Sequence, residues 1–374
     1  MKLDRSTREG IAASALTIRA LSADAIERAN SGHPGLPLGC AELGALIFGE
    51  ILRQYPGDPQ WMDRDRFVLS AGHGSMLLYS LLFLSGYGLT LDDIRSFRQL
   101  GSRTPGHPER GLTPGVETTS GPLGQGFANA VGMAIAERML AARFNTRDCP
   151  IVDHCTYVLA GDGDLMEGVT GEAASLAGHL GLGKLIVFYD SNAITIDGNT
   201  DLASSDDVPA RFRACNWQTL EGSAYDLEGI LDLVGQARKE TGRPSLILLR
   251  STIGCGAPNL AGSHRAHGGP LGTQELAAMK QALGVTEDFF VSPAARAYFA
   301  GRRQFWEDEY HRWSKLFDAW KAENPDLYRE WQRLHDGQHQ AIEAADGSHA
   351  GLQRESAPLR LPEFSVGDKI PTRI

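Results

Sequence analysis

Residues 156–198 read TYVLAGDGDLMEGVTGEAASLAGHLGLGKLIVFYDSNAITIDG. The stretch is apolar up to a Gly-Asp-Gly turn at 161–163, continues in a helical pattern and becomes apolar again shortly before Asn192. This order predicts a strand, a crossover helix and a second strand parallel to the first. Because parallel strands end at the same edge of a sheet, Asp162 and Asn192 are expected to lie side by side there, where open α/β sheets bind ligands.

The chemistry of these two side chains indicates a metal bound together with a diphosphate. A carboxylate and an amide oxygen suit Mg²⁺, which proteins usually hold through one or two groups while the phosphates of the ligand supply the rest. Gly161 and Gly163 allow the backbone to approach a bulky diphosphate closely. Short Gly-Asp-Gly turns are also common on protein surfaces, so the stretch alone leaves an ordinary surface turn as the alternative.

Length and composition describe a large globular protein. The chain has 374 residues, of which 42% are hydrophobic and 22% charged, with a formal net charge of −10 and a pI near 5.6. This charge argues against a nucleic-acid or anionic-membrane surface. No stretch approaches the roughly 20 apolar residues of a membrane-spanning helix, and the first residues contain no signal-peptide pattern. The cysteines include no CxxC pair, which favours reduced thiols in the cytoplasm; they are Cys40, Cys149, Cys155, Cys215 and Cys255.

Strand-like and helix-like segments alternate along most of the chain, which predicts an α/β fold with a doubly wound, mostly parallel sheet. Besides the two strands described above, strands are expected at 66–70, 217–221 and 245–250, and helices at 11–30, 36–52, 75–84, 127–143, 208–214 and 227–238. From Pro293 onward, aromatic residues among many charges predict one or two amphipathic helices. We therefore expect an α/β domain at 1–290, a helical extension packed on it at 291–340 and a linker at 341–374.

Several histidines fall in glycine-rich strand ends or loops. They are His33 in SGHPG, His73 in SAGHGS, His107 in PGHPE, and His264 and His267 in AGSHRAHG. A lone histidine is more often structural than catalytic, but similar Gly-flanked histidines at turns that could share one sheet edge indicate a site. Imidazoles move protons on hydroxylated substrates near neutral pH and also donate to phosphate oxygens. Two of the loops, 100–126 and 252–272, are long for a compact domain, which is typical of functional segments.

Seven segments follow one another in the order found in transketolases, and together they resemble the N-terminal, diphosphate-binding half of that family. They are SGHPG, LSAGHGS, PGHPE, GPLGQG, GDGxxxEG, YDSNxITIDG and PNxAGSHxxHGxPLG, and they cover roughly residues 10–340. The Gly-Asp-Gly turn followed by an Asn 30 positions after its Asp resembles the thiamine diphosphate motif. The ordered set is far more specific than any one segment. The chain departs from the usual pattern at Ser120, where the family generally has Thr, and at Ser191, where it often has an acid.

The resemblance implies the thiamine diphosphate-binding fold, thiamine diphosphate as cofactor, and Mg²⁺, or Ca²⁺ or Mn²⁺ in its place. By the family pattern, Asp162, Asn192 and the backbone carbonyl of Ile194 are expected to hold the metal, and Gly163 to lie against the diphosphate. Asp162, Asn192 and Gly163 are also the positions that the side-chain chemistry favoured for a metal and a diphosphate, whereas Ile194 is implied by the resemblance alone.

The family pattern also implies roles for the histidines. His73 and His264 are expected to reach the cofactor diphosphate or the reacting carbons, and His33 and His264 to handle substrate hydroxyl protons. His107 is expected to hold the C1 hydroxyl of the two-carbon fragment. The predicted catalytic set is therefore His33, His73, His107 and His264.

Three further residues complete the cofactor-binding set that the resemblance implies. Gly121 and Leu123 are expected to contact the aminopyrimidine side of the cofactor, and Glu167 to lie at a dimer contact linked to the opposite active site. An acid at a helix N-terminus that stabilises the helix dipole is the alternative interpretation of Glu167. The full predicted cofactor-binding set is His73, Gly121, Leu123, Gly163, Glu167, Asn192 and His264.

Transketolases transfer a two-carbon ketol unit from a ketose phosphate to an aldose phosphate, with the cofactor as electron sink. In the family, the Glu that activates the cofactor and most residues that clamp a substrate phosphate belong to a second, pyrimidine-binding domain. The final residues, LPEFSVGDKIPTRI, resemble the junction into that domain. We therefore expect the N-terminal subunit of a split transketolase, active only with a C-terminal partner subunit in an α₂β₂ assembly.

Other interpretations stay open at this point. The α subunit of a 2-oxoacid dehydrogenase and a deoxyxylulose-phosphate synthase fragment share the Gly-Asp-Gly and Asn pattern, but neither normally combines it with PGHPE and AGSHxxHG. A non-catalytic cofactor-binding fragment, or a truncated chain, is the alternative outside catalysis. Within the transketolase hypothesis, a sulfo-sugar or branched sugar is an alternative to ordinary pentose phosphates, because residues 1–374 do not discriminate between them.

Overall fold

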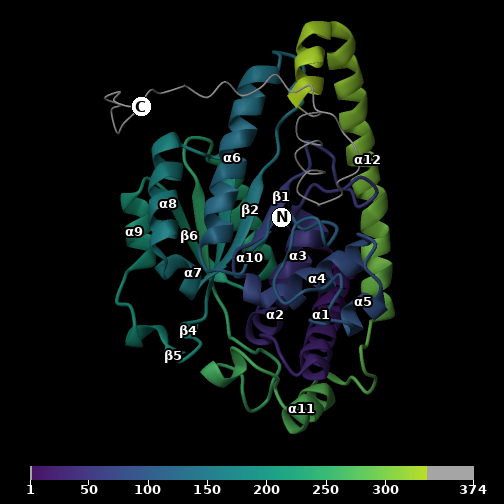
Figure 1. The fold of residues 1–374 in the computed structure, drawn as a ribbon, viewed down its shortest axis with the longest axis vertical. Coiled ribbons are helices and arrows are strands. Elements are labelled where there is room, and N and C mark those ends of the chain that lie inside the picture. Colours follow the sequence, from purple (N-terminus) through teal and green to yellow (C-terminus); the bar gives the residue numbers. More distant parts are fainter. Residues whose placement is uncertain (1, 335–374) are drawn as a thin grey trace, which may run out of the picture. The chain divides into compact units, whose positions relative to one another are not determined.

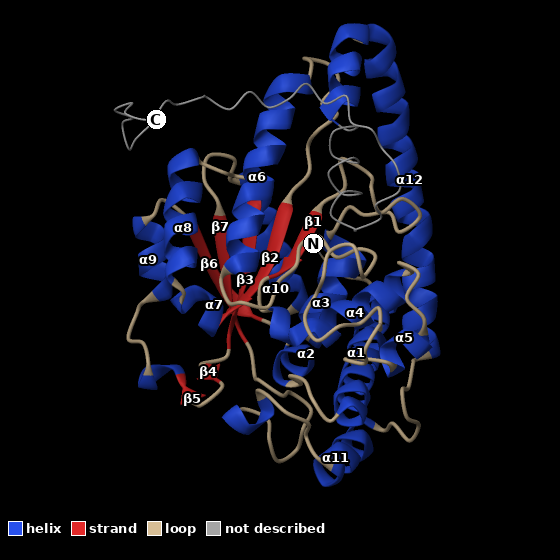
Figure 2. Cartoon of the chain, viewed as in Figure 1, coloured by secondary structure: helices blue, strands red, loops and turns tan. Residues whose placement is uncertain are grey.

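The computed structural model describes residues 2–334. Its centre is a five-stranded, fully parallel sheet with the strand order β1-β2-β3-β7-β6 (Figure 2). The strands are β1 (Arg66–Leu69), β2 (Thr156–Gly161), β3 (Leu185–Ser191), β6 (Gln218–Ser223) and β7 (Ser245–Arg250). A separate antiparallel pair, β4 (Ile194–Thr195) and β5 (Gly198–Asn199), follows β3 directly. The predicted α/β fold with a mostly parallel sheet is confirmed.

The central strands are apolar on both faces because helices cover the sheet on both sides. Alternate residues of each strand enter different cores: in β2, Tyr157 and Leu159 join one buried cluster, while Val158 and Ala160 join the other. The second cluster joins the sheet to α6 (Gln125–Phe144), α8 (Gly168–Leu180) and α9 (Val208–Ala214). The first cluster joins the opposite face to five other helices (Figure 1), which are α1 (Arg5–Ala29), α3 (Ala41–Leu46), α4 (Ser75–Ser85), α10 (Leu227–Lys239) and α12 (Pro293–Glu323).

The direction in which the chain crosses the sheet explains which helix covers which face. The step from β1 to β3 passes through α6 and α8, which cover the same face, and the return step from β6 to β7 uses α10 (Leu227–Lys239), which covers the other. Crossover connections are almost always right-handed, so a reversal of direction moves the helix to the opposite face. This is the doubly wound arrangement that the alternating segments predicted.

The remaining helices follow the predicted segments closely, with one informative difference. The segment 36–52 was expected to form one helix, but it is divided at Cys40 into α2 and α3 and ends in a π-helical turn. The bounds are α1 (Arg5–Ala29), α2 (Gly35–Gly39), α3 (Ala41–Leu46), η1 (Ile47–Ile51), η2 (Gly72–Gly74), α4 (Ser75–Ser85), α5 (Leu91–Arg95), α7 (Asp162–Met166), η3 (Thr200–Leu202), η4 (His264–Ala266) and α11 (Thr273–Leu283). The sequence did not predict α11.

The amphipathic helix expected after residue 291 is present as α12 (Pro293–Glu323), which packs along α1 and α4. Its aromatic residues form a continuous contact series with Tyr55, Trp61 and Phe144. Asn324 is the C-cap of this helix. Residues up to Leu327 belong to one compact unit, and the predicted linker at 341–374 lies outside the described residues. In the described part of the chain, no helix is both long and apolar enough to cross a membrane.

Candidate active site

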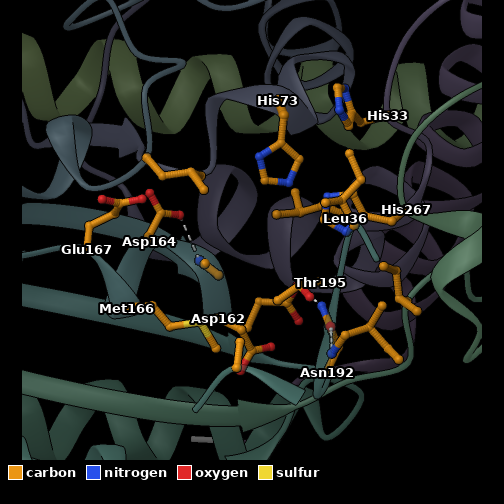
Figure 3. Close-up of a pocket in the computed structure, with 18 of the residues that line it drawn as sticks. His33, Leu36, His73, Asp162, Asp164, Met166, Glu167, Asn192, Thr195 and His267 are labelled. Carbon is orange, nitrogen blue, oxygen red and sulfur yellow. Dashed lines mark hydrogen bonds between the residues drawn. The ribbon is translucent and has the colours of Figure 1, made fainter. Parts of the chain in front are cut away.

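A cavity of about 470 Å³ opens at the edge of the sheet where β2 and β3 end. Its size falls within the range that small-molecule and cofactor sites usually have. Figure 3 shows His33, His73 and His267 on one side of it and Asp162 and Asn192 on the other. The segments that supply these side chains are far apart in the sequence, and the parallel sheet brings them together because its strands end at a common edge.

Asp162 is the first residue after β2, and it lies almost entirely below the surface at 8% exposure. Its carboxylate accepts a hydrogen bond from Tyr189 Oη at 2.5 Å and one from the Ala193 backbone N–H at 3.2 Å. Burial, opposed by the Tyr189 hydrogen bond and reinforced by the negative charge of Asp190, raises the pKa of Asp162 to about 6. A buried acid beside a second buried acid is poised to gain from a cation.

Asn192 follows β3, and its orientation is fixed from two sides. Its Nδ2 donates to Asp190 Oδ2 at 2.9 Å, and its Oδ1 accepts from the Ile194 backbone N–H at 3.0 Å. Between them, Ala193 has a φ of +60°, a left-handed conformation that an alanine adopts only at a cost in free energy. The strained turn places the Asn192 side chain and the Ile194 segment beside Asp162.

A second acid of the Gly-Asp-Gly-Asp turn has a different role. Asp164 is fully buried and accepts hydrogen bonds from Ser70 Oγ at 2.8 Å and from the backbone N–H groups of Gly124 and Gly161 at 2.9 and 3.0 Å. These donors come from the end of β1, from the GPLGQG segment and from the end of β2. Asp164 therefore ties together three of the segments that surround the cavity, a role that the sequence analysis missed.

The imidazoles form one compact group. The ring centroids of His33 and His73 are 5.1 Å apart, those of His73 and His267 also 5.1 Å, and those of His33 and His107 6.4 Å. Within residues 2–334, His33 Nδ1 is buried and has no hydrogen-bond partner. Such an atom is costly unless a ligand or another group supplies the partner.

Burial keeps the imidazoles neutral. Burial, reinforced by the neighbouring rings, lowers the pKa of His33 to about 4 and that of His73 to about 3, and Arg98 contributes at His33. Burial also lowers the pKa values of His107 and His267. A neutral imidazole has one nitrogen that donates and one that accepts, so each ring can form a hydrogen bond with a hydroxyl group in either direction near neutral pH.

Two glycines permit the close packing around these rings. Gly121 has a φ of +150°, and a Cβ there would lie 3.1 Å from His107 Cγ. A Cβ on Gly72, beside His73, would meet the Gly121 backbone nitrogen and Ser120 Oγ at 2.7 Å. A side chain at either position would push the histidine loops apart.

All but one of the predicted site residues line this cavity. Those that do are His33, His73, His107, Gly121, Leu123, Asp162, Gly163, Glu167, Asn192 and Ile194. Glu167 lies between α7 and α8, is exposed in this chain, and forms the N-cap of α8 without a side-chain cap hydrogen bond. The interpretation that Glu167 stabilises the dipole of α8 is therefore supported only by the position of Glu167 at the helix N-terminus.

The exception is His264, which is exposed on η4 and does not line the cavity. The neighbouring His267 lies there instead, because the Gly269 backbone N–H donates to Gly32 O at 2.6 Å and holds its segment against the His33 loop. The sequence analysis assigned His264 to the catalytic and cofactor-binding sets, whereas the structure has His267 in the cavity. A glycine directly after His267 was the usable signal.

The donor set fits a divalent metal held jointly with a diphosphate. One carboxylate, one amide and one backbone carbonyl would leave several coordination positions of Mg²⁺ for phosphate oxygens, as Mg²⁺ sites usually do. Beside them, Gly163 lines the cavity, and a Cβ there would lie 3.1 Å from Leu123 Cδ1. The residues present fit the cofactor as well as the metal.

Comparison with known families decides which cofactor this is. The model of the transketolase thiamine diphosphate binding domain matches residues 11–340. The chain belongs to the transketolase family. The resemblance that the seven ordered segments carried is thus confirmed, as is the thiamine diphosphate-binding fold.

Individual transketolases agree with this assignment. The chain is 57% identical to the transketolase of Treponema pallidum over 98% of its own length and 54% of that protein, and 48% identical to that of Geobacillus stearothermophilus over 96% and 52%. A Pichia stipitis transketolase in complex with sedoheptulose 7-phosphate superposes with a TM-score of 0.85 at 45% identity, covering 88% of this chain and 49% of that one. The chain therefore spans about half the length of the transketolases it matches.

Proposed function

We propose that this chain is the thiamine diphosphate-binding subunit of a split transketolase, which transfers a two-carbon ketol unit from a ketose phosphate to an aldose phosphate. The activity requires a second chain that corresponds to the other half of the relatives and carries a pyrimidine-binding domain, in an α₂β₂ assembly. The observation that carries the proposal is the cavity that joins four neutral imidazoles to Asp162 and Asn192 in a member of this family.

In this proposal the acid edge of the cavity binds the cofactor. Asp162, Asn192 and the carbonyl of Ile194 would hold Mg²⁺, or Ca²⁺ or Mn²⁺, and Gly163 would lie against the diphosphate. Gly121 and Leu123 would contact the aminopyrimidine side. When bound, thiamine diphosphate supplies the electron sink for breaking and forming a bond to a carbonyl carbon.

The imidazoles act on the substrate. Neutral His33 and His267 accept and return hydroxyl protons, His107 orients the C1 hydroxyl, and His73 donates toward the diphosphate or the reacting carbons. His267 thereby takes the place that the sequence analysis gave to His264. The burial that lowers their pKa values also excludes water from the reacting atoms.

Substrate class, partner and compartment are parts of the same proposal. The Pichia stipitis relative was solved with sedoheptulose 7-phosphate, which favours sugar phosphates as substrates. Glu167, exposed at the rim, is the residue we assign to the contact with another subunit. All five cysteines are free, in keeping with a cytoplasmic protein. We also propose the division into 1–290, 291–340 and 341–374.

The test is a reconstitution. The chain is mixed with a purified chain that carries the second half, with thiamine diphosphate and Mg²⁺, and ketol transfer is followed from xylulose 5-phosphate to ribose 5-phosphate. Sulfo-sugar and branched-sugar acceptors are assayed in parallel, and pyruvate decarboxylation serves as the control for 2-oxoacid chemistry. We expect turnover only when both chains are present, and loss of it in Asp162→Asn.

Two results contradict the proposal. Turnover by this chain alone would remove the requirement for a partner. Cofactor binding without turnover by the mixture, for every sugar in the panel, would identify a non-catalytic cofactor-binding fragment.

A further inference from the structure

Arg98 lies between the two loops that carry His33 and His107. Its Nη1 donates to Ser31 Oγ at 2.8 Å, two residues before His33, and its Nη2 donates to Gly106 O at 3.4 Å, one residue before His107. The guanidinium thus reaches both loops while Arg98 itself does not line the cavity.

The packing against Gly106 is close. A Cβ on Gly106 would lie 3.1 Å from Arg98 Nε and 3.3 Å from its Cζ, so any larger residue there would displace the guanidinium. Ser75 and Tyr79 also anchor the His107 loop, through Gly106 O and Pro105 O. Within residues 2–334, however, Arg98 is the one side chain that is hydrogen-bonded to both histidine loops.

The backbone of Arg98 has a conformation that an arginine seldom adopts. Its φ is +60°, and its backbone N–H donates to Thr104 O at 3.0 Å, which closes a tight turn. Its Nε is buried and, in the described part of the chain, lacks a hydrogen-bond partner. A left-handed arginine and a buried donor without a partner both cost free energy, and they are typical of positions held for function.

We propose that Arg98 is a positioning residue for the imidazoles: its guanidinium fixes the spacing of the His33 and His107 loops and places a positive charge beside both rings. The use of these rings in proton transfer rests on the proposed function, whereas the role of Arg98 in placing the loops does not depend on it.

The charges around the two rings support this role. His33 faces His73, His107, His267 and Arg98. After burial and His267, the charge of Arg98 is the next cause that lowers the pKa of His33, and after burial it is the largest cause at His107. Glu109 opposes it by raising the pKa of His107. Arg98 thus helps to keep both rings neutral.

The first experiment separates the charge of Arg98 from the rest of the site. Histidine-ring NMR signals of the full chain, without cofactor or partner, are titrated between pH 3 and 8 for wild type, Arg98→Met and Arg98→Lys, because the wild-type midpoint of His33 is expected at about pH 4. We expect the protonation midpoints of His33 and His107 to rise in Arg98→Met and to stay near wild type in Arg98→Lys. The exposed His179 and His311 serve as internal references that should not move.

The second experiment tests the geometry while the charge remains. Arg98→Lys cannot bridge two loops with a planar fork, and Gly106→Ala crowds the guanidinium. In the reconstituted enzyme both should lower kcat by about tenfold or more with a smaller change in KM, because misplaced proton-transfer groups slow chemistry more than binding. Arg103→Met is the matched control, since the Arg103 side chain contacts Asp93 and the Gly88 carbonyl and does not join the His33 loop to the His107 loop, so this variant should keep full turnover.

Midpoints in Arg98→Met equal to those in Arg103→Met, together with full turnover in Gly106→Ala, would overturn the inference. If Arg98→Met does not fold, Gly106→Ala and Arg98→Lys carry the test. Because the titration needs neither cofactor nor partner, a shift of the midpoints without ketol transfer by the wild-type mixture would count against the proposed function and leave the role of Arg98 intact.

Discussion

The two edges of the parallel sheet both bury charged side chains, but they treat them in opposite ways. Where the strands begin, the charges are paired within the chain: Asp63 contacts Arg53 at 2.8 Å, and Lys184 contacts both Glu137 and Asp153 at 2.6 Å. Where the strands end, Asp162 and Asp190 lie near one another without a cation among the described residues, and the neighbouring imidazoles are neutral.

The difference indicates which edge of such a sheet binds ligands. Burying a charge is unfavourable unless it is paired, so one edge lowers that cost with its own ion pairs. At the other edge, the buried carboxylates of Asp162 and Asp190 line a cavity of about 470 Å³. A metal and a diphosphate bound there would supply the missing partners.

The largest expected effect is the loss of cofactor binding in Asp162→Asn. The substitution keeps the shape and the hydrogen-bond acceptor but removes the charge that attracts the metal, so Mg²⁺-dependent affinity for thiamine diphosphate should fall by about 100-fold or more. Isothermal titration calorimetry measures it. Asp63→Asn, the equivalent change at the other edge, should bind like wild type; equal losses in the two variants would refute the comparison.

Within the Gly-Asp-Gly-Asp turn, the neighbouring acid should affect stability instead. Asp164→Ala leaves three buried donors, those of Ser70, Gly124 and Gly161, without their acceptor, which should lower the free energy of unfolding by about 3 kcal/mol. Urea unfolding measures the loss. Asp162→Asn is the control and should unfold near the wild-type midpoint. The roles would be reversed if Asp162→Asn were the less stable of the two.

The edge where the strands begin should make the stability of the protein depend on pH. Burial raises the pKa of Asp63 from 3.8 to about 6, and burial, reinforced by Arg66, lowers that of His154 well below 6.5. The stabilising contribution of Asp63 is therefore full below pH 3.8 and lost as the pH rises through about 6. The stabilising contribution of His154 is present above pH 6.5 and lost as the pH falls below that value. Between about pH 4 and 6, the two residues therefore change the free energy of unfolding with pH in opposite directions.

Asp63→Asn removes the contribution of Asp63 to the pH dependence of the free energy of unfolding and leaves that of His154. The free energy of unfolding of this variant should then fall more steeply than that of wild type between pH 6.5 and 5, by up to about 1.4 kcal/mol per pH unit. Urea unfolding at several pH values gives both slopes. Parallel slopes for the two proteins would mean that the pKa of Asp63 is the same in the folded and the unfolded chain.

The smallest expected effect concerns Gly163, the glycine that we propose lies against the diphosphate. In Gly163→Ala the new Cβ would lie 3.1 Å from Leu123 Cδ1, so the cofactor affinity should fall only a few-fold, with stability changed by less than about 1 kcal/mol. Gly171→Ala is the matched control, because a Cβ there meets nothing within 4 Å and should stabilise α8 slightly. Unchanged affinity in Gly163→Ala would show that the diphosphate does not approach this backbone.

The sequence predicted the sheet and its carboxyl edge well because local signals carried them. Apolar runs bounded by glycine located β1, β2, β3 and β7, and the rule for parallel strands placed Asp162 beside Asn192. The same local signals missed the division of the predicted helix 36–52 at Cys40, because both parts have the helical apolar pattern.

What the sequence could not supply depends on contacts between distant segments. Asp164 resembles Asp162 in its surroundings along the chain, and both are buried in the folded chain. The hydrogen bonds from Ser70 and Gly124, which come from distant segments, distinguish Asp164 as the anchor from Asp162, the proposed metal ligand. His267 is followed directly by a glycine, whereas His264 is not, but the hydrogen bond that joins Gly269 to Gly32 and holds the His267 segment at the cavity exists only in the folded chain. Arg98 lies in no motif, and its link between two histidine loops exists only in the folded chain.

The most direct test of the contrast between the two edges is a calorimetric titration of the chain with thiamine diphosphate, in EDTA and in Mg²⁺, for wild type, Asp162→Asn and Asp63→Asn. We expect wild type and Asp63→Asn to bind thiamine diphosphate only in the presence of Mg²⁺, and Asp162→Asn to lose this binding. Binding that persists in EDTA, or that survives in Asp162→Asn with the wild-type affinity, would contradict this expectation.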